Sequence, residues 1–182
     1  TWNTPGWSIA TEFWTYLAFA LLVKYAYGAR ACILTATVAV SLAVIAAYSP
    51  RYMNASYDYG FIRTLAGFAA GALVFEVWRW RAGTRPLQTA NATLVESGAI
   101  LAAVAFVTLA DQSALSLLAP IVFAGVVLVF IAEAGAVSRL LKTRPLQTLG
   151  LLSYSIYMVH LFIGTYTTNF AKLLQAKTGR PM

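Results

Sequence analysis

One carboxylate lies near the start of a long apolar segment. Glu12 is part of the stretch Trp7–Tyr16, and the apolar run continues to Val23. At helical spacing, Ser8, Glu12 and Thr15 share one face. An ionised side chain inside a bilayer costs about 3 kcal/mol, so it usually faces protein or a wet cavity. We therefore predict that Glu12 belongs to an intramembrane site; the alternative is a headgroup-level residue that faces water.

A second group of polar side chains lies late in the chain. Ser153, Tyr157 and His160 share one face of a predicted helix, and His160 is the only histidine. A buried imidazole needs a hydrogen-bond partner, which Ser153 or Tyr157 could supply. With one histidine, one cysteine (Cys32) and no ligand spacing, the sequence indicates no metal site.

Arg63 opens another apolar segment. Two interpretations stay open: its side chain extends to the membrane interface, or it binds an anionic group in a cavity. Gly67 and Gly71 follow at a spacing that lets membrane helices approach closely. Glu76 and Arg79, three residues apart, are predicted to form an ion pair at the interface.

The composition is typical of an integral membrane protein. Of 182 residues, 60% are hydrophobic and only 10% are charged, whereas soluble domains have about 25% charged residues. The net charge of +7 comes from short basic clusters between apolar runs, not from a nucleic-acid-binding surface. We predict an all-α, polytopic membrane helix bundle in which residues 1–182 form a single transmembrane domain. Its six predicted spans are residues 7–26, 32–49, 61–78, 94–110, 114–133 and 149–170.

The charges of the connections between these spans predict their orientation. The first, third and fifth connections hold eight basic and no acidic residues, while the second and fourth hold one basic and two acidic residues. The positive-inside rule places the odd connections in the cytoplasm and the N-terminus outside. The basic tail would then also be outside, which conflicts with the rule unless a further span follows.

Two motifs in this sequence resemble the signature of the acyltransferase 3 family of integral-membrane acyltransferases. They are Asn3-x-Pro5-x-Trp7-Ser8-x-x-x-Glu12-Phe13-x-x-Tyr16 and Leu149-Gly150-x-x-Ser153-Tyr154-Ser155-x-Tyr157-x-x-His160. Arg63 with Gly67 and Gly71 is similar, more weakly, to an arginine-plus-glycine span of the family. The resemblance implies an O-acyltransferase whose catalytic histidine lies in an earlier span, with one more span at the end. We therefore expect this chain to be a fragment that is inactive alone.

The resemblance also implies roles for residues of this chain. Glu12 would orient the missing histidine or balance its charge, as carboxylates do in hydrolase triads. The predicted substrate-binding residues are Asn3, Trp7, Ser8, Arg63, Tyr157 and His160. Among them, Trp7 and Ser8 would shape the pocket and Arg63 would bind a phosphate or carboxylate. Tyr157 and His160 would brace the bundle or line the path of the acceptor.

The implied partners are acyl-CoA, membrane lipid and a carbohydrate or lipid-linked sugar. Acyl-CoA, with acetyl-CoA as the expected case, would be the donor on the cytoplasmic side of a bacterial inner membrane, and no cofactor is expected to stay bound. One alternative is a small transporter or flippase, although the sequence shows no inverted repeat or paired broken helices. The other is a non-catalytic scaffold, in which substitution of Glu12 and His160 would be silent.

Overall fold

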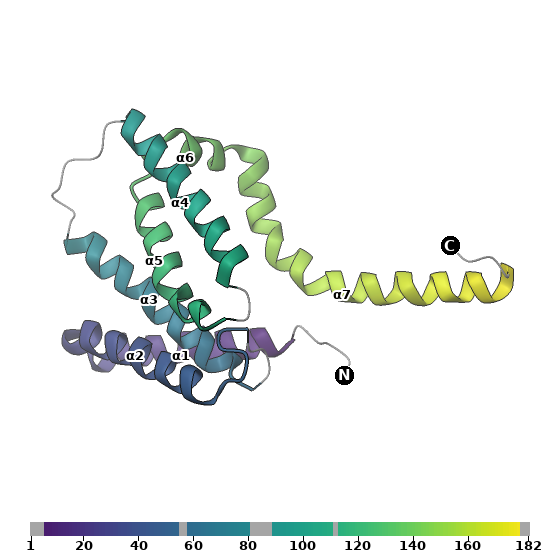
Figure 1. Cartoon of the computed structure of the whole chain (residues 1–182), viewed down its shortest axis with the longest axis horizontal. Coiled ribbons are helices and arrows are strands. Elements are labelled where there is room, and N and C mark those ends of the chain that lie inside the picture. The colour runs from purple at the N-terminus through teal and green to yellow at the C-terminus, as the bar shows by residue number, and fades with distance from the viewer. Residues whose placement is uncertain (1–5, 55–57, 81–88, 111–112, 179–182) are drawn as a thin grey trace.

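The chain folds into a helix bundle (Figure 1). A computed structural model describes residues 6–54, 58–80, 89–110 and 113–178. Every regular element in this part is helical, which confirms the predicted all-α class. The elements are α1 (Gly6–Tyr25), η1 (Tyr27–Ala29), α2 (Arg30–Tyr48), α3 (Gly60–Trp80), α4 (Thr89–Ala110), η2 (Ala114–Leu118), α5 (Ala119–Phe130), α6 (Ala136–Leu141) and α7 (Arg144–Thr178).

Helix α3 is the centre of the bundle. α1, α2 and α5 all pack against it, and α4 packs against α5. Phe68 of α3 contacts two rings of α1, with ring centroids 5.6 Å from Tyr16 and 5.1 Å from Phe19. Aromatic pairs at these separations stabilise packing beyond the area that they bury. The face of α1 that carries Tyr16 and Phe19 is therefore fixed against α3.

The close packing of α3 relies on alanines and not on the predicted glycine pair. Ala66, Ala69 and Ala70 are all buried. Gly67 and Gly71 are exposed, and a Cβ atom added at either one would meet nothing within 4 Å. Because residues one position apart on a helix are turned by about 100°, the glycines point away from the face that Ala66 and Ala70 bury.

The six predicted spans are not confirmed. Among the described residues, three helical segments are long and apolar enough to cross a membrane: Tyr27–Tyr48, Gly60–Trp80 and Asn91–Ala110. The arms of α7 on either side of a 40° bend make a fourth if they count as one span. The apolar segment Ala114–Phe130, which consists of the 3-10 helix η2 and α5, is shorter than these three segments.

Contacts between the connections show that they alternate between two ends of the bundle. Arg79 Nη1 donates to the Tyr27 hydroxyl at 2.8 Å, so the first and third connections meet at one end. The Met53 N–H donates to Ser116 Oγ at 3.3 Å, which brings the second and fourth connections together at the other. α6, in the fifth connection, packs against α4. This alternation agrees with the arrangement that the loop charges predict; the side facing the cytoplasm stays a prediction.

Cysteine labelling in intact cells tests the predicted orientation, with the exposed Cys32 first replaced by alanine. Cysteines at Trp80 and Leu141 are expected to react only after the membrane is permeabilised. Cysteines at Asn54 and Ser113 should react with a membrane-impermeant reagent without permeabilisation, since the positive-inside rule puts them outside. All four positions are exposed in the structure. Labelling of the Trp80 position from outside would contradict the orientation.

Candidate functional site

Glu12 lies in the first half of α1 and is half-buried. One turn later Thr15 is only 1% exposed, and its hydroxyl donates to the Thr11 carbonyl at 2.8 Å. Glu12 shares this face with Thr15 and, further along, with Phe19, whose ring contacts α3. The face predicted from the sequence is thus the face that packs into the bundle, and Glu12 lies at its outer end.

Arg63 lies in the first turn of α3 and is half-buried. Its Nη1 donates to the Met53 carbonyl at 3.2 Å, which ties α3 to the connection from α2. α1 and α3 run in the same direction, because Tyr27, just after the end of α1, contacts Arg79 in the last turn of α3. The structure therefore places Glu12 and Arg63 at the same end of the α1–α3 pair. This end of the pair thus carries one carboxylate and one guanidinium group.

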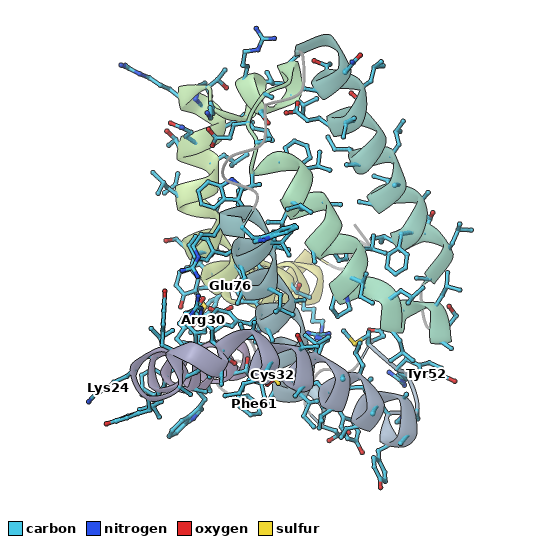
Figure 2. The ribbon with its side chains drawn as sticks, turned by 90° about the vertical axis from the view of Figure 1, so that its left-hand side faces the viewer. Lys24, Arg30, Cys32, Tyr52, Phe61 and Glu76 are labelled. Carbon is cyan, nitrogen blue, oxygen red and sulfur yellow. The ribbon has the colours of Figure 1, made fainter. Side chains whose placement is uncertain are left out.

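An apolar recess of about 430 Å³ lies near this end of the pair. Its lining includes Trp14 and Leu17 of α1. It also includes Phe61 of α3, which is labelled in Figure 2. Trp14 is two residues from Glu12, and side chains at that spacing do not face each other. The recess is therefore on a different face of α1, and neither Glu12 nor Arg63 lines it.

Tyr157 and His160 come together on α7. Their ring centroids are 5.5 Å apart, and His160 Nδ1 lies within hydrogen-bond distance of the Tyr157 carbonyl oxygen. Both side chains are exposed. In the described part of the chain their polar contacts are within their own helix, and none of these contacts reaches Glu12 or Arg63.

A buried carboxylate on α4 was not singled out in the sequence analysis. Glu96 is only 2% exposed. Its Oε1 accepts the Gly135 N–H at 2.8 Å and the Ser138 hydroxyl at 2.6 Å, and its Oε2 accepts the Ser138 N–H at 3.1 Å. These backbone groups open α6, where helical N–H groups have no partner inside the helix. Glu96 therefore caps α6 and fixes the fifth connection to α4.

Gly135 is required by this arrangement. A Cβ atom at position 135 would overlap the Glu96 carboxylate. The rule that drew attention to Glu12, an ionisable residue inside an apolar segment, also applies to Glu96 and could have found it.

A basic cluster made of Tyr27, Arg30, Glu76 and Arg79 lies where α1 and α3 end and α2 begins. The predicted pair is present, with Arg79 Nη2 at 3.2 Å from Glu76 Oε2. Arg30 adds two contacts to the same carboxylate, Nε to Oε1 at 2.6 Å and Nη2 to Oε2 at 3.0 Å (Figure 2). The Arg30 guanidinium also lies 3.7 Å from the centroid of the Tyr27 ring. Two guanidinium groups face one carboxylate, so the cluster carries a net positive charge.

A family model described as an acyltransferase domain matches residues 1–181. The chain belongs to the acyltransferase 3 family. Comparisons with curated proteins and with solved structures give no match. The predicted family is confirmed, and with its apolar helices this acyltransferase is an integral membrane protein.

The structure describes part of the site that the sequence predicts for this acyltransferase. The structure brings Glu12 and Arg63 to one end of the α1–α3 pair, and Tyr157 and His160 together on α7. Asn3 and the side chains of Trp7 and Ser8 lie outside the described residues. The catalytic role of Glu12 and the substrate-binding roles of the other residues stay predictions.

Proposed function

We propose that this acyltransferase moves an acyl group, acetyl in the expected case, from acyl-CoA to a hydroxyl group of a cell-envelope or exported carbohydrate. The observation that carries the proposal is the family match over residues 1–181. The acceptor is a free or lipid-linked sugar, and the membrane is the bacterial cytoplasmic membrane. The geometry also supports the proposal, because the Glu12 carboxylate lies on the face of α1 that packs against α3.

Acyl transfer to an alcohol needs a base for the hydroxyl proton and donors for the developing oxyanion. The sugar oxygen attacks the thioester carbonyl carbon while its proton passes to a histidine, which the family resemblance assigns to protein outside residues 1–182. The carbon–sulfur bond then breaks, and the CoA thiolate takes up the proton. Glu12 acts as a positioning residue that orients this histidine and balances the imidazolium charge.

The other predicted residues bind the substrates. Arg63 binds a phosphate or carboxylate of the donor or acceptor, because a guanidinium matches the geometry of either group. Asn3, Trp7 and Ser8 shape the pocket, while Tyr157 and His160 line the path of the acceptor or brace α7.

The test is turnover by the purified full-length protein in lipid nanodiscs. With acyl-CoA and a carbohydrate acceptor, we expect release of free CoA that depends on the acceptor, together with an O-acylated product detected by mass spectrometry. Residues 1–182 alone are expected to give neither, because the base lies elsewhere. Turnover by residues 1–182 would contradict that location of the base. Sugar transport into vesicles by the full-length protein, without CoA release, would favour the transporter alternative.

A further inference from the structure

The two guanidinium groups of the basic cluster are not equivalent. Arg30 holds the Glu76 carboxylate with two N–H groups, at 2.6 and 3.0 Å, and its side chain is only 13% exposed. Arg79 reaches the same carboxylate with a single contact of 3.2 Å, and its side chain is 47% exposed. Paired contacts between a guanidinium and a carboxylate are the stronger arrangement. Because one carboxylate balances one guanidinium, Arg30 satisfies Glu76 and the charge of Arg79 is left over.

Tyr27 orients Arg79 and adds a second hydrogen-bond donor. The Tyr27 hydroxyl accepts an N–H of Arg79 at 2.8 Å, so its own proton can be donated to another group. The contacts of Arg79 with Glu76 and Tyr27 each use one of its five N–H donors. The Arg30 guanidinium lies 3.7 Å from the centroid of the Tyr27 ring and holds this ring in place. An incoming anion therefore meets two donors, from η1 and α3, that are already oriented.

A phosphate group suits this arrangement. Arginine binds phosphate oxygens through charge-assisted hydrogen bonds, and a phosphate has enough oxygens to accept from Arg79 and from the Tyr27 hydroxyl at once. Lys24, in the last turn of α1, is exposed and lies on the same side of the bundle as Arg30 and Glu76 (Figure 2). Its ammonium group adds a further positive charge that attracts anions to this side.

Exposed aromatic rings next to the cluster suit a nucleotide. Tyr25 precedes Tyr27 by two residues, Trp80 follows Arg79 directly, and both rings are exposed. A base can stack on such a ring beside a positively charged group that binds its phosphate. The cluster also joins the first and third connections, which the positive-inside rule places in the cytoplasm. The nucleotide end of the proposed donor, acyl-CoA, is available on that side of the membrane.

We propose that Arg79 and Tyr27 bind a phosphate of the acyl-CoA donor, while Arg30 and Glu76 hold these two side chains in position. This inference rests on the proposed function, because it takes the donor from there. The cluster lies at the opposite end of the α1–α3 pair from Glu12. Substitutions in the cluster should therefore weaken binding of the donor and leave the chemical step unchanged.

Binding of adenosine 3′,5′-bisphosphate to the full-length protein in detergent tests this site without turnover. The probe carries the adenine and the 3′- and 5′-phosphates of CoA but no thioester. Arg79→Gln removes a charged donor and should raise the Kd about tenfold, whereas Tyr27→Phe removes a neutral donor and should raise it about threefold. In the acyl-transfer assay, both variants should raise the KM for acyl-CoA by similar factors, with kcat and the KM for the acceptor unchanged.

Arg144→Gln and Tyr48→Phe are the matched controls, and both should bind the bisphosphate like the wild type. Arg144 is an exposed arginine at the start of α7, and Tyr48 is an exposed tyrosine at the far end of α2 from the cluster. Thermal unfolding in the same detergent identifies folded variants, and Tyr27→Phe still decides if Arg79→Gln does not fold.

Three results would each overturn the proposal: no binding of the bisphosphate by the wild type, an unchanged Kd in either folded cluster variant, or displacement of the bisphosphate by equimolar short-chain phosphatidylglycerol. The last result would assign the cluster to a lipid headgroup. A wild-type protein that binds the bisphosphate through Arg79 but does not turn over would count against the proposed acyl transfer and not against this phosphate site.

Discussion

Glu12→Gln in the full-length protein is expected to lower the rate of acyl transfer by about two to four decades, with little change in folding. The amide keeps the size of the side chain and can still accept a hydrogen bond, but it cannot balance the charge of an imidazolium. Because Glu12 is half-buried at the outer end of the packed face of α1, a neutral amide is also easier to accommodate there than a carboxylate. CoA release and thermal unfolding should be measured on the same samples.

Two further variants distinguish the effect of losing the Glu12 charge from a general disruption of the fold. Glu12→Asp keeps the charge but shortens the side chain by one methylene, so we expect an intermediate rate. Glu133→Gln is the control, because Glu133 is an exposed carboxylate that pairs with Lys142 in the fifth connection. It should turn over at the wild-type rate. Full activity in well-folded Glu12→Gln would remove Glu12 from the mechanism and favour a water-facing residue at headgroup level.

Gly135→Ala and Glu96→Ala are each expected to lower the midpoint of thermal unfolding by about 5–10 °C. In Glu96→Ala, the Gly135 and Ser138 N–H groups and the Ser138 hydroxyl lose their acceptor in a buried place. In Gly135→Ala, the new methyl group overlaps the Glu96 carboxylate and forces the fifth connection away from α4. Both changes therefore free α6 from α4.

The double variant tests whether these two effects share one cause. With Glu96 already truncated to alanine, the methyl group at position 135 has no carboxylate to overlap. We expect Gly135→Ala to lower the midpoint much less in that background, which is non-additivity of the kind seen for contacting residues. Gly98→Ala, also on α4 but in open space, should leave the midpoint unchanged or raise it slightly. Additive losses in the double variant would contradict a direct contact between positions 96 and 135.

Local patterns predicted the central helices well. The apolar segments 32–49 and 61–78 correspond to α2 and α3 within two residues at each end, because hydropathy is a property of consecutive side chains. α4 begins five residues before its predicted start, since polar residues lower the hydropathy of its first turns without ending the helix. α6 was expected to be part of a connection, and it is too short for any periodicity to predict.

Pairing between distant segments was beyond the reach of these patterns. The Glu76–Arg79 pair was predicted because residues three apart on a helix are neighbours, whereas Arg30, 46 residues earlier, was not. The partners of Glu96 were beyond reach for the same reason, because they lie 39 and 42 residues later, on another element. The relation between α1 and α3 that puts Glu12 and Arg63 at one end likewise depends on tertiary packing.

The capping of α6 by Glu96 has a consequence for synthesis of the chain. Ser138 follows Glu96 by 42 residues, so at 5–20 residues per second it is added about 2–8 s after the carboxylate. During that interval the Glu96 carboxylate on α4 lacks the hydrogen-bond donors of Gly135 and Ser138. This is the stage at which nascent segments enter the lipid. An insertase or the preceding helices must shelter Glu96 until α6 forms, and slow translation between α4 and α6 would prolong its exposure to proteolytic quality control.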